Sequence, residues 1–152
     1  MNVYDKLKEL HVELPQAIAP AAAFVMSVRT GNLLFVSGHI SRREGKPWSG
    51  QLGAELATQE GKLAARHAAI DVLATMHHAL GDLNKVQRIV KVLSLVNSTA
   101  RFMEHHLVAN GASELLQEVF GEKGKHARSA IGVAQLPLGA CFEMELVAEI
   151  TD

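Results

Sequence analysis

The sequence predicts one α+β domain in which helices cover one face of a β-sheet. Residues 54–80 carry apolar side chains at steps of three, four or seven, the spacing of an amphipathic helix. Residues 87–96 are β-branched and alternate, and residues 141–150 alternate between apolar and mostly acidic side chains, which is typical of strands. Because the chain has 152 residues and no linker, we expect a single domain over 1–152.

Turn-forming residues define the N-terminal elements. Residues 3–11 are predicted to form a short amphipathic helix. Residues 24–40 are predicted to form a hairpin, because two apolar arms flank a turn in which Gly31 can take a positive φ. Residues 41–53 are rich in glycine and are predicted to be a loop, and we expect Trp48 in it to pack across a subunit boundary.

Glycine and proline residues also punctuate the C-terminal half. Gly81 is predicted to end the long helix as its C-terminal cap. A second helix is predicted over 113–120, with Ser113 as its N-cap and Gly121 after its end. The strand that follows is predicted to form a hairpin with 141–150 through the turn "LPLGA".

Composition narrows the classes of function. The net charge is −1 with neutral histidines, which argues against a nucleic-acid partner, because neutralising phosphates calls for a basic excess. The single cysteine, Cys141, cannot form a disulfide within the chain. No apolar run approaches the roughly 20 residues of a membrane span, and the N-terminus has no signal-peptide core. We therefore expect a cytoplasmic protein without a membrane partner.

One face of the predicted sheet is left without a cover. The two helices can cover the other face, and a chain of this size has no further elements to spare. We therefore predict a homo-oligomer.

An arginine opens the strand before the last turn. Period-two alternation puts Arg128 on one face with the small residues Ala130 and Gly132, which leaves room around the guanidinium. A half-buried arginine is costly unless an anion meets it. That anion could be Glu143 or Glu145 of the last strand, or a substrate carboxylate held by two parallel N–H···O bonds. Spacing alone leaves these alternatives open.

Eight histidines raise the question of a metal site. The pairs 77–78 and 105–106 are adjacent, and neighbours on a helix point about 100° apart, so their rings do not converge. The sequence has no His-Glu-x-x-His or Cys-x-x-Cys spacing. We expect neither a metal nor an organic cofactor.

Two motifs resemble a known family. "ARSAIGVAQLPLGACFEMELVA" resembles the C-terminal signature of the Rid family, the reactive intermediate deaminases, which are also called YjgF-like or L-PSP endoribonuclease-like proteins. "GNLLFVSGHI" resembles the second motif of the same family. The two motifs occur in the family's order, and the resemblance covers roughly residues 15–150.

The resemblance implies a fold, an assembly and an activity. The fold is chorismate mutase-like, a mixed sheet backed by two helices. Three chains pack their sheets inward as a barrel, so the implied homotrimer has clefts between subunits. Active members are hydrolases that convert imines and enamines of 2-amino acids to 2-keto acids and ammonia without a cofactor. By resemblance, Arg128 grips the substrate carboxylate, Glu143 positions or activates water, and Ser37 beside Gly38 lines the cleft.

This sequence departs from the family pattern at three places. Phe24 stands where active members often have tyrosine, and Ala130 stands where several have cysteine. The segment 97–125 is longer than in compact members, which marks a longer subgroup. Two alternative functions follow: a non-catalytic module that binds small carboxylates in the same cleft, and the endoribonuclease activity of the family's older label.

Overall fold

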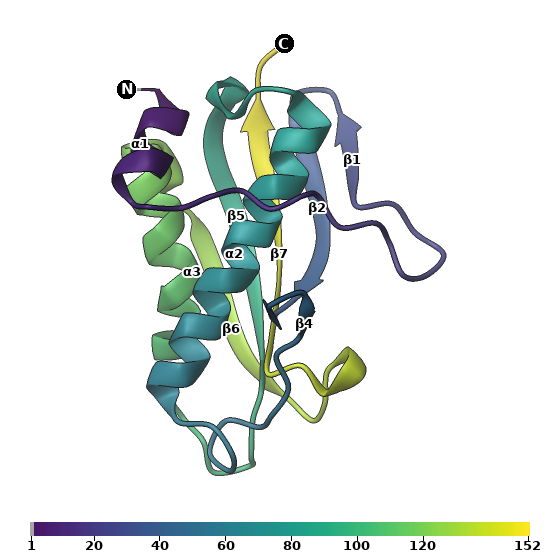
Figure 1. Cartoon of the computed structure of the whole chain (residues 1–152), viewed down its shortest axis with the longest axis vertical. Helices are drawn as coiled ribbons and strands as arrows, with labels where there is room; N and C mark the ends of the chain where they lie inside the picture. Colours follow the sequence, from purple (N-terminus) through teal and green to yellow (C-terminus); the bar gives the residue numbers. More distant parts are fainter. Residues whose placement is uncertain (1) are drawn as a thin grey trace.

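Three α-helices and seven strands make up the chain in the computed structural model, which describes residues 2–152. In chain order the elements are α1 (Val3–Glu9), β1 (Ser27–Thr30), β2 (Leu33–Ile40), β3 (Arg42–Arg43), β4 (Lys46–Pro47), α2 (Thr58–Leu80), β5 (Val86–Asn97), α3 (His105–Phe120), β6 (Ala127–Val133) and β7 (Phe142–Ile150). Figure 1 shows these elements along the chain. The predicted α+β class is confirmed.

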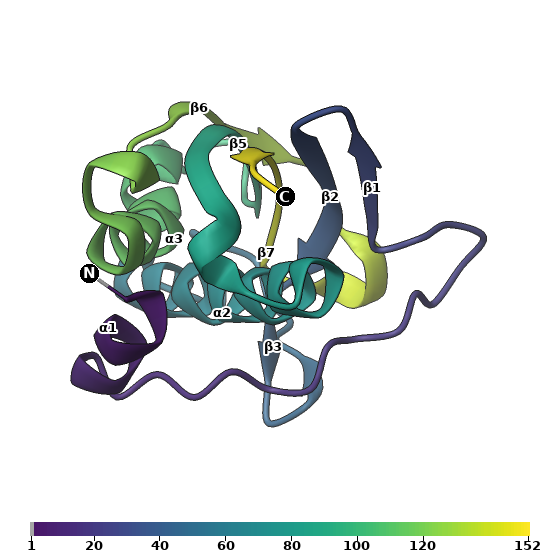
Figure 2. The ribbon, with the colours of Figure 1, turned by 90° about the horizontal axis from the view of Figure 1, so that it is seen from above.

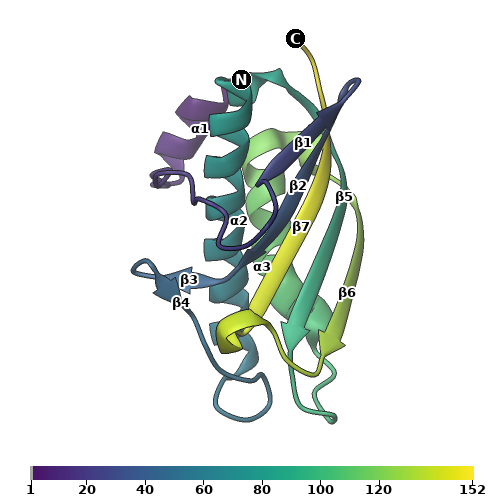
Figure 3. The ribbon, with the colours of Figure 1, turned by 90° about the vertical axis from the view of Figure 1, so that its right-hand side faces the viewer.

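Five of the strands form one mixed sheet in the order β1-β2-β7-β5-β6. Strand β6 runs parallel to β5, and the other neighbours are antiparallel. Helices α2 and α3 lie on one face of this sheet, and no helix within residues 2–152 covers the other face (Figure 3). The predicted arrangement of a mixed sheet backed by two helices is therefore confirmed.

The predicted final hairpin is wrong, because β5 lies between β6 and β7. Helix α3 connects the end of β5 to the start of β6, so β6 runs in the same direction as β5 and pairs with it. Strand β7 then pairs with the opposite edge of β5. The turn residues were read correctly, but residues 134–141 cross from the edge of the sheet to its centre instead of joining neighbours.

Two helix boundaries differ from the sequence prediction. Helix α3 begins at His105, so Ser113 lies inside the helix, 5% exposed, and is not an N-cap. Helix α2 begins at Thr58 instead of residue 54. The predicted C-terminal ends are confirmed: Gly81 takes φ 75° and donates to His77 O, and Gly121 donates to Gln117 O.

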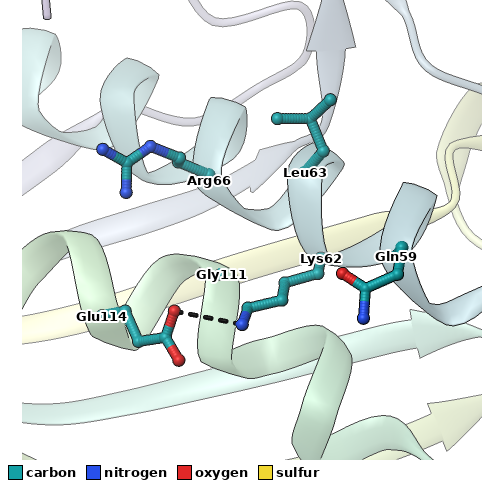
Figure 4. A pocket seen from close by; sticks show the side chains of 6 residues that line it. All are labelled: Gln59, Lys62, Leu63, Arg66, Gly111 and Glu114. Atoms are coloured by element: carbon teal, nitrogen blue, oxygen red, sulfur yellow. Dashed lines mark ion pairs between the residues drawn. The ribbon is translucent and has the colours of Figure 1, made fainter. Parts of the chain in front are cut away.

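The hydrophobic core lies between the two helices and the sheet. Gly111 lets α2 and α3 approach closely, because an added Cβ there would collide with the backbone oxygen of Lys62. Figure 4 labels both residues. Trp48 belongs to this core, 8% exposed, with its ring edge-on to His67, so its predicted place at a subunit boundary is wrong. Part of the predicted loop 41–53 also forms the short β3–β4 ribbon.

The N-terminal segment and the open sheet face complete the surface. Residues 12–26 cross the outer side of α2 before entering β1 (Figure 2). On the face without helices, Val28, Phe35 and Ile131 stay largely exposed. Within residues 2–152, no helix combines the length and apolar character that crossing a bilayer requires.

Candidate functional site

The sheet register puts Arg128 and Glu143 on opposite faces. Arg128 pairs with Val92, which also pairs with Leu146, and both of these are buried beneath the helices. Glu143 pairs with Leu95, three residues further along β5 and therefore on the open face. The two strands are two spacings apart, about 10 Å. Within one chain the two predicted catalytic residues do not converge.

This register also decides whether Arg128 can form an ion pair with Glu143 or Glu145 of the same chain. Glu145 pairs with Leu93, so it shares the open face with Glu143, away from the guanidinium. Among residues 2–152, no carboxylate lies within 4.0 Å of Arg128. The alternative of a salt bridge to either glutamate within the chain is therefore wrong.

Helix α3 holds Arg128 with uncharged groups. Nη1 of Arg128 donates to Asn110 Oδ1 at 2.9 Å and to Ser113 Oγ at 3.1 Å, and Nη2 donates to the backbone oxygen of His106 at 3.3 Å. These bonds use three of the five guanidinium N–H groups. The N–H of Nε and one N–H of Nη2 have no acceptor among the described residues. Two donors are what a bidentate carboxylate requires.

His126 extends this network by one residue. Its Nδ1 lies 2.7 Å from the oxygen of Gly124, and its Nε2 lies 2.9 Å from Ser113 Oγ. A carbonyl only accepts, so Nδ1 carries the proton and Nε2 accepts from the serine hydroxyl. Burial lowers the pKa of His126, and the charge of Arg128 lowers it further against an opposing bond to Gly124. The hydroxyl of Ser113 thus accepts from Arg128 and donates to His126.

Glu143 lies against a glycine of β2 on the open face. The β2–β7 register shifts between Val36 and His39, which places Gly38 directly beneath the Glu143 carboxylate. An added Cβ at Gly38 would collide with Glu143 Oε2. Burial raises the pKa of Glu143, and the neighbouring Glu145 raises it further. A carboxyl with a raised pKa is suited to exchange protons near neutral pH.

The other predicted residues divide between these two places. Ser37 lies beside Gly38, and its hydroxyl donates to the oxygen of Val25 at 2.6 Å, which ties β2 to the segment that carries Phe24. Phe24 is 46% exposed and precedes β1 instead of belonging to it. Ala130 lies on the Arg128 side, two residues along β6, and packs against the core.

Asn110 and Ser113 are functional candidates that the sequence prediction missed. They lie three residues apart on α3, so they share a face, and both contact Arg128. Polar side chains beside the buried Val108, Ala109 and Ala112 are a sequence signal for such contacts. A helix predicted to begin with Ser113 as its N-cap leaves Asn110 outside it, so the prediction does not place the two residues on one helix face.

A hollow between α2 and α3 lies apart from these residues. Figure 4 shows its lining: Gln59, Lys62, Leu63, Arg66, Gly111 and Glu114. Lys62 pairs with Glu114 at 3.2 Å across it. None of the candidate site residues takes part. Within residues 2–152, no group of three or more His, Cys, Asp or Glu side chains is arranged to hold a metal ion.

Comparison with known proteins identifies the family. The family model described as "YjgF/chorismate_mutase-like, putative endoribonuclease" matches residues 5–150. Protein TCP17 of Trypanosoma cruzi is 47% identical over 99% of this chain and 96% of its own length. A solved structure of a protein of unknown function from Agrobacterium tumefaciens is 40% identical, with a TM-score of 0.91 over 98% of this chain and 92% of its own.

A second solved structure, described as a "putative endoribonuclease" from Shewanella oneidensis, is 30% identical, with a TM-score of 0.95 over 99% of this chain and 100% of its own. Both structures cover the longer segment 97–125 together with the rest of the fold. The chain therefore belongs to the YjgF-like family, the Rid family that its two motifs resemble, and has the family's chorismate mutase-like fold.

Proposed function

We propose that this protein hydrolyses 2-imino acids and their enamine tautomers to 2-keto acids and ammonia. Arg128 carries the proposal, because its guanidinium is half-buried and no carboxylate of the described chain neutralises it. A half-buried guanidinium without a neutralising carboxylate favours binding of an external anion. A substrate carboxylate meets the requirement through the two remaining N–H groups.

The proposed site lies between subunits. Arg128 and Glu143 face opposite sides of the sheet, so one substrate reaches both only if they come from different chains. The exposed apolar side chains of Val28, Phe35 and Ile131 on the open face favour such packing. We propose a homotrimer whose open faces meet, in which Arg128 of one subunit lies across a cleft from the partner's Glu143.

The proposed chemistry needs a carboxylate clamp and a proton-exchanging group. For 2-iminopropionate, one water adds to the imine carbon, the C–N bond breaks, and pyruvate and ammonia leave. Arg128 holds the carboxylate, which fixes the imine carbon in place. Glu143, whose pKa is raised by burial and by Glu145, accepts a proton from water and returns it to the departing nitrogen. Because Gly38 has no Cβ, the Glu143 carboxylate has space next to β2.

Turnover of imines that are generated in the assay mixture tests the proposal. An amino-acid oxidase acting on alanine supplies 2-iminopropionate, and release of pyruvate is followed with and without the protein. We expect Arg128→Ala to lower kcat/KM by about 10²-fold or more through loss of orientation. Glu143→Gln should lower kcat by about 10²–10⁴-fold through loss of general-base catalysis.

Two controls accompany this experiment. Arg29→Ala removes the same charge from an exposed position of β1, on the helix side of the sheet and away from the open faces, and should leave turnover unchanged. Light scattering should give about three times the 16.4 kDa of one chain. A stable monomer that turns over imines would contradict the inter-subunit site, and equal rates for wild type and Arg128→Ala would contradict the role of Arg128.

A carboxylate-binding module without turnover is the second candidate. Phe24 favours it, because this position offers no hydroxyl to the cleft. Binding of pyruvate in a calorimeter together with no acceleration of imine hydrolysis would establish this candidate instead. The endoribonuclease alternative requires RNA affinity that falls steeply with salt, and absence of binding at low salt would remove it.

A further inference from the structure

We propose that Asn110 and Ser113 are positioning residues that hold the Arg128 guanidinium without neutralising it. This inference rests on the proposed function of Arg128 as a carboxylate receptor. It adds that affinity for the carboxylate depends on the acceptors of α3 being uncharged. Helix α3, which the longer segment 97–125 contributes, would then take part in binding through Arg128 instead of touching the substrate.

The three acceptors around Arg128 share one property. An amide oxygen, a hydroxyl oxygen and a backbone oxygen fix the direction of the guanidinium, and none carries a charge. A carboxylate in the same place would form an ion pair with Arg128 and compete with the ligand for it. Neutral acceptors therefore fix the geometry of the arginine and leave its charge for the ligand.

The acidic residues of this helix region are engaged elsewhere. Glu114 is next to Ser113 in the chain, yet it points toward α2 and pairs with Lys62 (Figure 4). Glu118 pairs with Arg66 on α2 at 3.4 Å, and Glu104 accepts from the Thr58 hydroxyl. Helix α3 thus presents Glu114 and Glu118 to α2, and the Asn110 amide and the Ser113 hydroxyl to Arg128 of β6.

Ser113 needs a partner that sets the direction of its hydroxyl. Ser113 Oγ accepts from Arg128, so its own proton must go to another acceptor. His126 Nε2, at 2.9 Å, is that acceptor, and the bond from Nδ1 to Gly124 holds the ring in the required tautomer. The hydroxyl is therefore fixed with a lone pair toward Arg128.

Replacing Asn110 by aspartate, which has the same shape but carries a negative charge, tests the inference. Asn110→Asp keeps the size and shape of the side chain, so it preserves packing and strengthens the hold on Arg128. Calorimetry with pyruvate should nevertheless show a Kd at least about tenfold higher than wild type, equivalent to 1.4 kcal/mol. In turnover, KM should rise by a similar factor while kcat changes little. Asn32→Asp adds the same charge at the exposed β1–β2 turn and should leave Kd unchanged.

Removal of the acceptors gives an independent readout that needs no ligand. The ¹⁵N relaxation order parameter of the Arg128 Nε–H group reports how firmly the guanidinium is held. Ser113→Ala and Asn110→Leu should lower it relative to wild type, and Asn110→Asp should keep or raise it. Unchanged order in both removal variants would show that these residues do not hold Arg128 and would overturn the inference.

The outcomes separate this inference from the proposed function. Loss of pyruvate binding in Arg128→Ala, with wild-type affinity in Asn110→Asp, overturns the inference and leaves Arg128 as the receptor. Wild-type affinity in Arg128→Ala overturns both. Loss in Arg128→Ala, weakening in Asn110→Asp and no change in Asn32→Asp support both.

Discussion

Replacing Gly38 by alanine is expected to displace the Glu143 carboxylate and leave the sheet in place. An added Cβ would collide with Glu143 Oε2, but it would lie 3.2 Å from Cδ and 3.6 Å from Cγ of the same side chain. Only the far end of a flexible side chain is obstructed. The carboxylate can therefore turn away without any movement of the backbone of β2 or β7.

The expected effect on stability is small because two terms oppose one another. Forcing Glu143 away from its preferred rotamer costs about 0.5–1.5 kcal/mol. Replacing glycine by alanine inside a strand stabilises by about 0.5–1 kcal/mol. The free energy of unfolding should therefore change by less than about 1 kcal/mol. In a Glu143→Ala background the obstruction is absent, so the same substitution should stabilise, with a coupling energy of about 1 kcal/mol.

The expected effect on turnover is much larger. A displacement of a catalytic group by about 1 Å can cost about 10²-fold in rate. Urea unfolding of wild type, the two single variants and the double variant measures the coupling, and release of pyruvate from 2-iminopropionate measures turnover. Wild-type turnover in Gly38→Ala, together with the same stability change in both backgrounds, would refute the contact between Gly38 and Glu143 as the cause.

Three further predictions concern packing and buried titratable groups. Gly111→Ala should destabilise by about 1–3 kcal/mol in urea unfolding, because its Cβ would collide with the backbone of Lys62 and overpacking costs this much; an unchanged midpoint would contradict the close helix contact. Burial raises the pKa of Asp71 to about 6. The native state thus holds this proton at a pH where the unfolded chain has released it, and stability falls as pH rises from about 4 to about 6. Asp71→Asn should therefore exceed wild type by about 1 kcal/mol at pH 7.5 and by little at pH 4, the partial exposure of Asp71 limiting the gain. Burial lowers the pKa of His39 below its ordinary 6.5, so stability should fall as pH drops below about 6.5, and His39→Gln should show a shallower slope between pH 7 and 5; equal slopes would assign the acid sensitivity to other groups.

Local patterns were sufficient for most of the elements. The helical spacing of 54–80 and the positive φ available to Gly81 gave α2 and its end within a few residues, because both depend on neighbours in the chain. The alternation of 142–150 correctly separated the buried side chains from the acidic ones. The beginning of α3 was missed, because Asn110 and Gly111 are weak helix formers and packing against α2 and the sheet overrides their preference.

The candidate site was predicted as residues but not as an arrangement. Arg128, Glu143 and Gly38 came from the family motifs, and alternation correctly put small residues beside Arg128. The pairing of β6 with β7 was assumed from their adjacency in the chain, and that assumption brought Arg128 and the glutamates together. Strand order is a property of the whole sheet, so no local signal could correct it.

The sequence by itself determined that this chain has the α+β fold of the YjgF-like family, and it left open whether a glutamate of the chain or an external anion meets Arg128. Only the tertiary structure decided which groups surround that arginine. The α3 crossover makes β6 parallel to β5, which turns Arg128 toward Asn110 and Ser113 and leaves Glu143 on the open face. Asn110 and Ser113 precede Arg128 by 18 and 15 positions in the chain, and they meet it because α3 packs against the sheet that contains β6. Periodicity in the sequence does not specify this packing.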